Sequence, residues 1–214
     1  MKKITFYLLV IGFVFCSNAQ KRSGFGLHAG TNASGVYNIT DGYLDAYDPV
    51  AGYQVGLRYN LKLGPVGLCS EVNWNVINYF YPPVYLANLN PWGTDIYFTG
   101  GEANLNYVSI PLLLKLYIGG FNLHVGAQSS YLMSGTDALG GDITSDTPGV
   151  NDIDVAAVVG LGLDMKNGLY FAWRSTASIT TIDDADYLPS VGVIMLEDDL
   201  PRLVSSSFAV GYNF

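Results

Sequence analysis

The sequence predicts an all-β protein that folds as an eight-stranded antiparallel up-and-down transmembrane β-barrel, with short periplasmic turns and four long extracellular loops. Eight segments alternate apolar and polar residues with the period of two that is typical of strands. The connections between these segments are alternately short and long. Half of the 214 residues are hydrophobic and 13% are charged, yet no segment after residue 20 is long and apolar enough for a membrane-spanning helix. A barrel reconciles these facts, because alternation dilutes its apolar residues.

Residues 1–19 are predicted to be a secretory signal peptide, and residues 20–214 to be the barrel domain. Two lysines precede the apolar stretch 4–15, and small residues lie just before the expected cleavage at Gln20. A stretch of about twelve residues is too short to span a bilayer as a helix, which takes roughly 17 to 25. Acylation of Cys16, as in a lipoprotein, is the alternative, but a bulky phenylalanine precedes this cysteine. The protein is therefore expected to be exported and, as a barrel, to lie in the outer membrane of a Gram-negative cell.

The eight predicted strands cover residues 24–32, 51–62, 66–80, 105–117, 121–132, 153–165, 169–179 and 205–214. Three connections are tight turns that contain glycine or Asn-Gly, as hairpins favour: residues 63–65, 118–120 and 166–168. The other four connections run from 18 to 25 residues. Connections of that length are uncommon in a compact soluble domain, but they are typical of one rim of an outer-membrane barrel.

Each strand has one apolar face, and its other face carries glycine, small polar residues and a few ionisable groups. In the first four strands the apolar positions are Phe25, Leu27 and Ala29, then Tyr53, Val55, Leu57, Tyr59 and Leu61, then Val66, Leu68, Val72, Trp74 and Val76, and then Val108, Ile110, Leu112, Leu114 and Leu116. In the last four they are Phe121, Leu123, Val125, Ala127 and Tyr131, then Val155, Ala157, Val159, Leu161 and Leu163, then Leu169, Phe171, Trp173 and Ala177, and finally Phe208, Val210, Tyr212 and Phe214.

The polar face is predicted to line the barrel interior. Alternation by itself also allows the reverse, a soluble ligand-carrying barrel with its polar face in water. That face carries seven charged residues, which is sparse for the exterior of a soluble barrel but fits a narrow lumen where opposite charges pair. An eight-stranded barrel is just wide enough to be filled by its own side chains, so we expect a closed barrel and no channel. The predicted lumen polar network consists of Arg58, Lys62, Glu71, Lys115, Asp164, Arg174, His28 and His124, with Asp154 as the seventh charge.

Aromatic residues on the apolar face gather near both ends of the strands. They are Tyr53, Trp74 and Tyr131 toward the loop end, and Tyr59, Phe121, Tyr212 and Phe214 toward the turn end. Two such aromatic belts are expected where rings meet lipid headgroups. The alternative is the ordinary preference of aromatic residues for strands.

The stretch YVSIPLLLKLYIGGFNLHVGAQSSYLM, residues 107–133, resembles the PorT-like outer-membrane β-barrel family of Bacteroidetes, as do the signal peptide, the eight strands and the closing phenylalanine. In that family a Tyr, an Ile-Pro pair and a Lys commonly mark the fourth strand, and here these are Tyr107, Ile110, Pro111 and Lys115. Relatives often have Arg-Tyr in the seventh strand, whereas here a serine follows the arginine. The resemblance implies an outer-membrane barrel, and the family's name comes from a member tied to type IX secretion. It also implies that the barrel assembly machinery recognises the terminal aromatic Phe214 as an assembly signal.

The long loops are strongly acidic. They hold fifteen of the eighteen Asp and Glu residues. Removal of the two lysines of the signal peptide would leave eight cations against eighteen acids, a net charge near −10, which argues against nucleic acid as a partner. We interpret the acidic loops as solubilising, mutually repulsive surface. The alternative is a divalent-cation site, for which residues 182–186 and 197–199 are the best clusters. The second loop, with YPPVYLANLNPWGTDIYF at residues 81–98, is rich in aromatic residues and favours a contact surface.

We predict no enzyme and no cofactor. The two histidines of the chain could form an acid-base set with Glu71, but they are better explained as single polar side chains that fill a lumen. Without the signal peptide Cys69 is the one cysteine left, so neither an intramolecular disulfide nor a cysteine metal site can form. The leading hypothesis is a closed, monomeric outer-membrane barrel with a structural, adhesive or partner-binding role through its loops. The alternatives are an accessory subunit of a type IX secretion machine and a lipid-modifying barrel enzyme. The expected partners are outer-membrane lipid, the barrel assembly machinery and secretion or surface proteins.

Overall fold

The structure is a computed structural model that describes residues 23–40, 43–46, 49–81, 84–86, 96–98, 101–137, 140–145, 147, 150–182 and 202–214. Eight long strands form the barrel: β1 (Gly24–Thr40), β3 (Val50–Leu63), β4 (Val66–Tyr81), β7 (Gly101–Ile118), β8 (Phe121–Thr136), β10 (Ile153–Asp164), β11 (Leu169–Ser178) and β12 (Arg202–Asn213). Four short strands lie between them: β2 (Tyr43–Ala46), β5 (Val84–Leu86), β6 (Ile96–Phe98) and β9 (Asp142–Ile143). No helix in the described ranges is long and apolar enough to cross a membrane.

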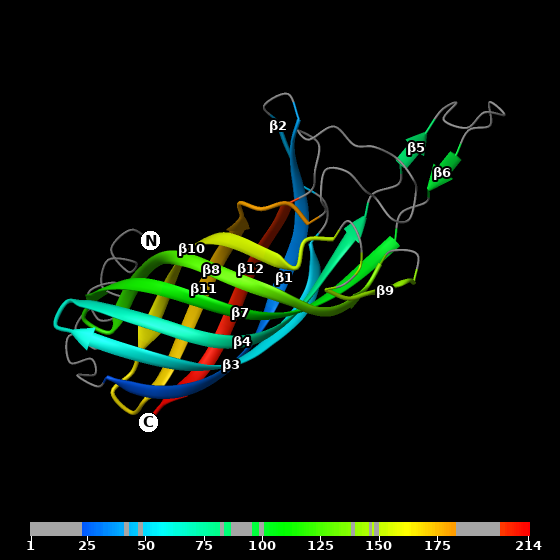
Figure 1. Cartoon of the computed structure of the whole chain (residues 1–214). Coiled ribbons are helices and arrows are strands. Elements are labelled where there is room, and N and C mark those ends of the chain that lie inside the picture. The colour runs from blue at the N-terminus through cyan, green and yellow to red at the C-terminus, as the bar shows by residue number, and fades with distance from the viewer. Residues whose placement is uncertain are drawn as a thin grey trace, which may run out of the picture.

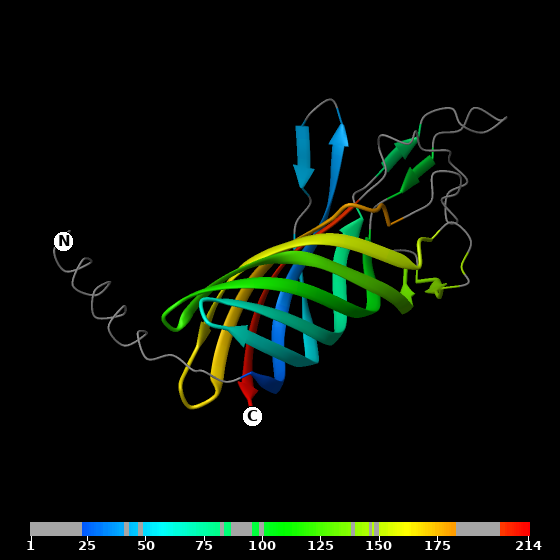
Figure 2. The ribbon, with the colours of Figure 1, turned by 60° about the vertical axis from the view of Figure 1, so that its left-hand side comes forward.

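The barrel is closed. Each long strand pairs antiparallel with the next one along the chain, and β12 returns to pair with β1 from Asn213 opposite Gly26 to Arg202 opposite Tyr37. In Figures 1 and 2 the strand β12 accordingly lies beside β1, and the chain ends at the same end of the barrel as the tight turns. Closure leaves no long strand with an open edge, which is what a lipid environment requires.

Glycine shapes the three tight turns that join the long strands at one end. Gly64, Gly119 and Gly168 have φ angles of 70°, 67° and 98°, in the left-handed region that side chains other than glycine rarely adopt. All three belong to turns predicted from the sequence. The opposite end carries the long connections, including the β1–β2 and β5–β6 hairpins that Figure 2 shows projecting beyond the barrel.

The predicted fold class is confirmed, while several strand ends differ. All eight predicted strands are present, and most of the differences lie at the loop end. There β1 continues to Thr40 and pairs with β2, and β7 begins at Gly101. Val76 was expected on the outward face but is 5% exposed. Alternation of exposure therefore breaks down at the loop end of β4, where Asn75 and Val76 are both buried.

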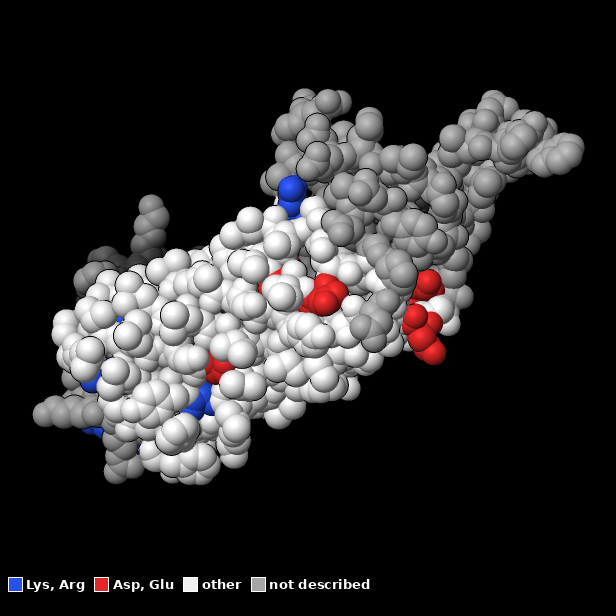
Figure 3. Space-filling model, in the orientation of Figure 1, with Lys and Arg blue, Asp and Glu red and all other residues white. Residues whose placement is uncertain are grey.

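The apolar face of the barrel points outward. Leu57, Leu112 and Val159 are 57%, 60% and 57% exposed, whereas the neighbouring inward side chains are almost fully buried. In Figure 3 the side of the wall that faces the viewer is almost free of charged residues. This arrangement is the reverse of a soluble barrel, and it places the polar side chains in the lumen.

Candidate functional site in the barrel lumen

An ion pair between opposite walls occupies the centre of the lumen. Glu71 on β4 accepts hydrogen bonds from both Nη1 and Nη2 of Arg174 on β11, each at 2.6 Å. The two strands are four steps apart in a ring of eight, so the pair spans the barrel. Asn73 Nδ2 donates to Glu71 at 3.2 Å, and the nearest imidazole nitrogen of His28 lies 3.8 Å from the carboxylate. A forked, charge-assisted contact of this kind is among the strong hydrogen bonds in proteins.

A second ion pair also crosses the lumen. Arg58 on β3 lies with Nη2 at 3.6 Å from Asp164 Oδ1 on β10, and these strands are again four steps apart. The Arg58 guanidinium carbon sits 3.7 Å from the centre of the Tyr170 ring, a cation–π contact. Asn122 Nδ2 donates to Asp164 Oδ2 at 3.2 Å, and the carbonyl oxygen Oδ1 of the same amide lies 3.0 Å from His124 Nδ1. Each carboxylate in the centre of the lumen is thus held by an arginine from the far wall.

The two lysines of the predicted network lie at different depths. Lys62 is half-buried near the turn end, with Nζ 4.0 Å from the centre of the Tyr117 ring. Tyr117 in turn donates a hydrogen bond to Asn60 at 3.0 Å. Lys115 is 1% exposed, and in the part of the chain that the structure describes it forms no ion pair with a carboxylate. All eight side chains of the predicted network therefore face the lumen, and six of them belong to two clusters, one around Glu71 and one around Asp164.

A small polar cavity lies beside Arg174. Its volume is about 30 Å³, and its lining comes from seven strands: Asn32, Gln54, Asn75, Ile77, Gln128, Asp154, Arg174, Thr176, Ser178, Leu203, Ser205 and Ser207. Space of this size holds about two water molecules. Beside Arg174 the described side chains therefore leave a small gap in the lumen.

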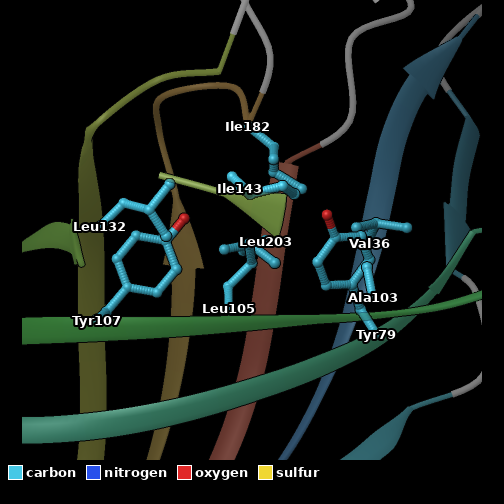
Figure 4. Close-up of a cluster of buried hydrophobic side chains, with 9 residues drawn as sticks. All are labelled: Val36, Tyr79, Ala103, Leu105, Tyr107, Leu132, Ile143, Ile182 and Leu203. Carbon is cyan, nitrogen blue, oxygen red and sulfur yellow. The ribbon is translucent and has the colours of Figure 1, made fainter. Parts of the chain in front are cut away.

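An apolar plug closes the lumen at the loop end (Figure 4). Its residues are Val36, Tyr79, Ala103, Leu105, Tyr107, Leu132, Ile143, Ile182 and Leu203. Ile143 and Ile182 come from the long connections rather than from the eight long strands, and they are 8% and 6% exposed. This plug was not predicted from the sequence. The signal was weak, because Ile143 and Ile182 are isolated apolar residues within acidic segments.

The residues of the predicted aromatic belts all point outward. Tyr53, Trp74 and Tyr131 are 58%, 42% and 44% exposed, and Tyr59, Phe121, Tyr212 and Phe214 are 43%, 48%, 47% and 63% exposed. At the turn end the rings associate in pairs, with centroids 4.9 Å apart for Phe25 and Tyr59 and 5.6 Å apart for Tyr212 and Phe214. The pairing of β1 with β12 brings both pairs to the same stretch of the wall.

Most of the predicted acidic surface lies outside the described residues. Residues 197–199 and all of the cluster 182–186 except Ile182 belong to that part of the chain, and the second loop is described only at its strands β5 and β6. Among the described side chains, no group of three or more His, Cys, Asp or Glu residues could hold a metal ion.

Comparison with known proteins agrees with the fold. Neisserial surface protein A is 12% identical over 90% of this chain and 98% of its own, with a TM-score of 0.52. Ail, the attachment invasion locus protein of Yersinia pestis, is 14% identical over 90% of this chain and 100% of its own, with a TM-score of 0.48. A search of curated proteins found no match. Residues 17–184 match the family described as outer membrane protein beta-barrel domain. This chain therefore belongs to the outer membrane protein β-barrel domain family.

Proposed function

We propose that this protein is a closed, non-conducting outer-membrane barrel whose loops carry a structural, adhesive or partner-binding role. The observation that carries the proposal is the filled lumen. Two ion pairs cross it, Glu71 with Arg174 and Arg58 with Asp164, and an apolar plug covers it at the loop end. The remaining cavity of about 30 Å³ is too small for a hydrated ion path. With the interior filled, the surfaces left for function are the loops and the lipid-facing wall.

The first experiment measures conductance. We expect the folded protein, reconstituted in planar lipid bilayers, to give no stable channel. A matched variant that replaces Ile143 and Ile182 by glycine removes the apolar contacts of the plug and leaves both ion pairs in place. It reports whether the plug or the ion pairs close the lumen. Regular conductance steps from the unmodified protein would overturn the proposal.

The second experiment concerns the loops. Variants in which the connection 183–201 or the connection 87–95 is shortened should no longer attach live cells to surfaces or to partner proteins. The barrel of each variant should still migrate as a heat-modifiable band. Loss of the folded band would instead report a folding defect, and the test would then be repeated with single substitutions of acidic residues in the same connections. Unchanged attachment and partner capture with every loop trimmed would contradict the proposal.

A second candidate role is that of an accessory subunit of a type IX secretion machine. It is supported by the resemblance of Tyr107, Ile110, Pro111 and Lys115 to the PorT-like pattern. Deletion of the gene should then impair secretion and surface motility. Normal secretion in the deletion strain would remove this candidate.

A lipid-modifying activity has little support in the geometry. His28 and His124 are 4% and 3% exposed and face the lumen, so neither imidazole can reach an acyl chain outside the wall. Lipid A with an unchanged mass spectrum after gene deletion is the expected result.

The proposal also covers export and assembly. Residues 1–19 would act as a signal peptide, and Phe214 as an anchor in the turn-end aromatic belt and as the signal read by the barrel assembly machinery. The exposed ring of Phe214 and its contact with Tyr212 support the anchoring role. The partners would be outer-membrane lipid and surface or secretion proteins, and the barrel would be monomeric and free of cofactors.

A further inference from the structure

Two buried hydrogen-bond donors at the polar cavity have no partner among the residues that the structure describes. Arg174 Nε and Gln54 Nε2 each lack a hydrogen bond to any described protein group. The two residues are 5% and 7% exposed, and both line the cavity beside the central ion pair. An unpaired buried donor costs about 1–3 kcal/mol, and more when it is charged, so both groups are expected to meet a ligand there.

The net charge of the lumen side chains indicates the sign of the charge that the ligand should carry. The inward faces of the eight long strands carry four cations, Arg58, Lys62, Lys115 and Arg174, against three carboxylates, Glu71, Asp154 and Asp164. The two arginines are matched by Glu71 and Asp164, and the described part of the chain gives Lys115 no carboxylate partner. With all seven groups ionised, the described inward faces therefore carry a net formal charge of +1. Charges in a medium of low dielectric act strongly at a distance.

The rest of the cavity wall offers both donors and acceptors, among them Asn75 Oδ1, which is buried and has no partner among the described residues. The side chains of Thr176, Ser205 and Ser207 line the cavity, and their hydroxyl groups can rotate to donate. One carboxylate, that of Asp154, also lines the cavity, and its Oδ1 accepts a hydrogen bond from Thr180 Oγ1 at 3.0 Å. An anion would be held by the donors of Arg174 and Gln54 and repelled by the Asp154 carboxylate.

We propose that this cavity is a site for one small monovalent inorganic anion of halide size, held by the N–H groups of Arg174 Nε and Gln54 Nε2 and by the neighbouring hydroxyls. A cavity of about 30 Å³ favours a monatomic ion, which is slightly larger than water, over larger anions such as sulfate or phosphate. The anion neutralises the excess charge of the lumen and satisfies both unpaired donors. The site concerns the stability of the closed barrel and is independent of what the loops bind.

The test uses the folded full-length barrel in detergent, with chloride replaced by gluconate at constant ionic strength. Titration with sodium bromide should raise the unfolding temperature along a saturating curve, because a ligand that binds only the folded state stabilises it by mass action. Crystals grown in bromide should show an anomalous peak within hydrogen-bond distance of Arg174 Nε and Gln54 Nε2. Water alone at the cavity, or a bromide effect that rises without saturation, would overturn the proposal.

Two variants separate the site from a general salt effect. Gln54→Leu keeps the size of the side chain and removes one free donor, so it should raise the half-saturating bromide concentration about tenfold, as loss of a hydrogen bond to a charge predicts. Gln128→Leu is the matched control. Gln128 also lines the cavity, but its amide already donates to Ser130 at 3.1 Å, so the bromide curve should keep its midpoint. Equal midpoints in Gln54→Leu and the unmodified protein would contradict the assignment even if both variants fold.

Discussion

Arg58 and Glu71 lie directly opposite each other in the register of β3 and β4, yet in the described structure neither is the other's ion-pair partner. Glu71 binds Arg174, and Arg58 lies against Asp164, in each case from the far side of the ring. Neighbours in register share a wall, and their side chains run parallel into the lumen. Side chains that meet end to end come from opposite walls, so the two ion pairs each connect opposite sides of the barrel.

Replacement of Glu71 by leucine should strongly destabilise the barrel, because it leaves the Arg174 guanidinium buried without a carboxylate. Breaking one partner of a buried pair costs about 3–5 kcal/mol. Urea unfolding in lipid vesicles measures this loss. The double variant Glu71→Leu/Arg174→Met should recover most of it, since paired apolar replacements are often neutral. A double variant as unstable as the single one would show that the unpaired charge is not the cause.

The thiol of Cys69 should report on closure of the lumen. In protein that lacks residues 1–19, Cys69 is the only cysteine. Its side chain is 0% exposed, and its Sγ lies 3.6 Å from the Glu71 carboxylate, so a membrane-impermeant maleimide should leave the folded barrel unlabelled. The control is Cys69→Ser/Asp142→Cys, because Asp142 is exposed at the loop end and should be labelled at once. Fast labelling of Cys69 in the folded protein would mean that the lumen is open.

A charged side chain introduced on the outward face of β7 should destabilise the barrel by an amount that depends on its depth in the membrane. Leu112 lies near the middle of the strand and is 60% exposed, whereas Ile118 lies at its turn end and is 46% exposed. Leu112→Arg should cost about 2–4 kcal/mol, and Ile118→Arg about 0–1 kcal/mol, since an arginine near the interface reaches the headgroups. Equilibrium folding into lipid vesicles gives both values. Equal costs would place the hydrocarbon layer elsewhere on the wall.

The seam between β1 and β12 should be sensitive to a methyl group at Gly30. A Cβ at this position would lie against the backbone carbonyl of Phe208, closer than side chains approach backbone, so the strands would have to move apart. Gly30→Ala should therefore destabilise the barrel by about 1–3 kcal/mol, as overpacking does. Gly24→Ala, whose Cβ would be 3.1 Å from the carbonyl oxygen of Phe214, is the milder control at the end of the same seam. The unfolding midpoints of Gly30→Ala and Gly24→Ala measure this difference in stability.

Phe214 and Asn213 should respond differently to substitution. Phe214 is 63% exposed on the outward face, and Asn213 is 6% exposed on the inward face. We expect Phe214→Asp to reduce insertion into the outer membrane sharply, and Asn213→Ala to leave most of it intact. The fraction of heat-modifiable protein in membrane extracts measures insertion. A larger loss with Asn213→Ala would contradict both roles proposed for Phe214.

The faces of the strands could be predicted because a period of two leaves a direct trace in the sequence. The segment 53–62 shows it plainly, with every second residue tyrosine, valine or leucine. The far end of β1 was missed because Val36 and Tyr37 are adjacent and the alternation stops there. Pairing with β2 and burial of Val36 in the plug extend the strand where the local pattern does not.

Membership of the lumen network could be predicted, but its partners could not. Alternation places Glu71, Arg58, Asp164 and Arg174 on the inner face. Which of these side chains meet depends on the tilt of the strands and on their order around the ring. The sequence of a single strand determines neither of these features. The plug could not be predicted for a different reason, because Ile143 and Ile182 fold inward from connections whose surrounding residues are acidic.

The two cross-lumen ion pairs also bear on how the barrel is made. Each joins a residue from the first half of the chain to one from the second, Glu71 to Arg174 and Arg58 to Asp164. A partly assembled sheet of β1 to β7 would hold Arg58 and Glu71 only beside each other, without the partners that each of them meets in the closed barrel. Such an intermediate is penalised at both sites until β10 and β11 arrive. Assembly of the barrel should therefore be cooperative, because both cross-lumen ion pairs form only when the ring of strands is complete.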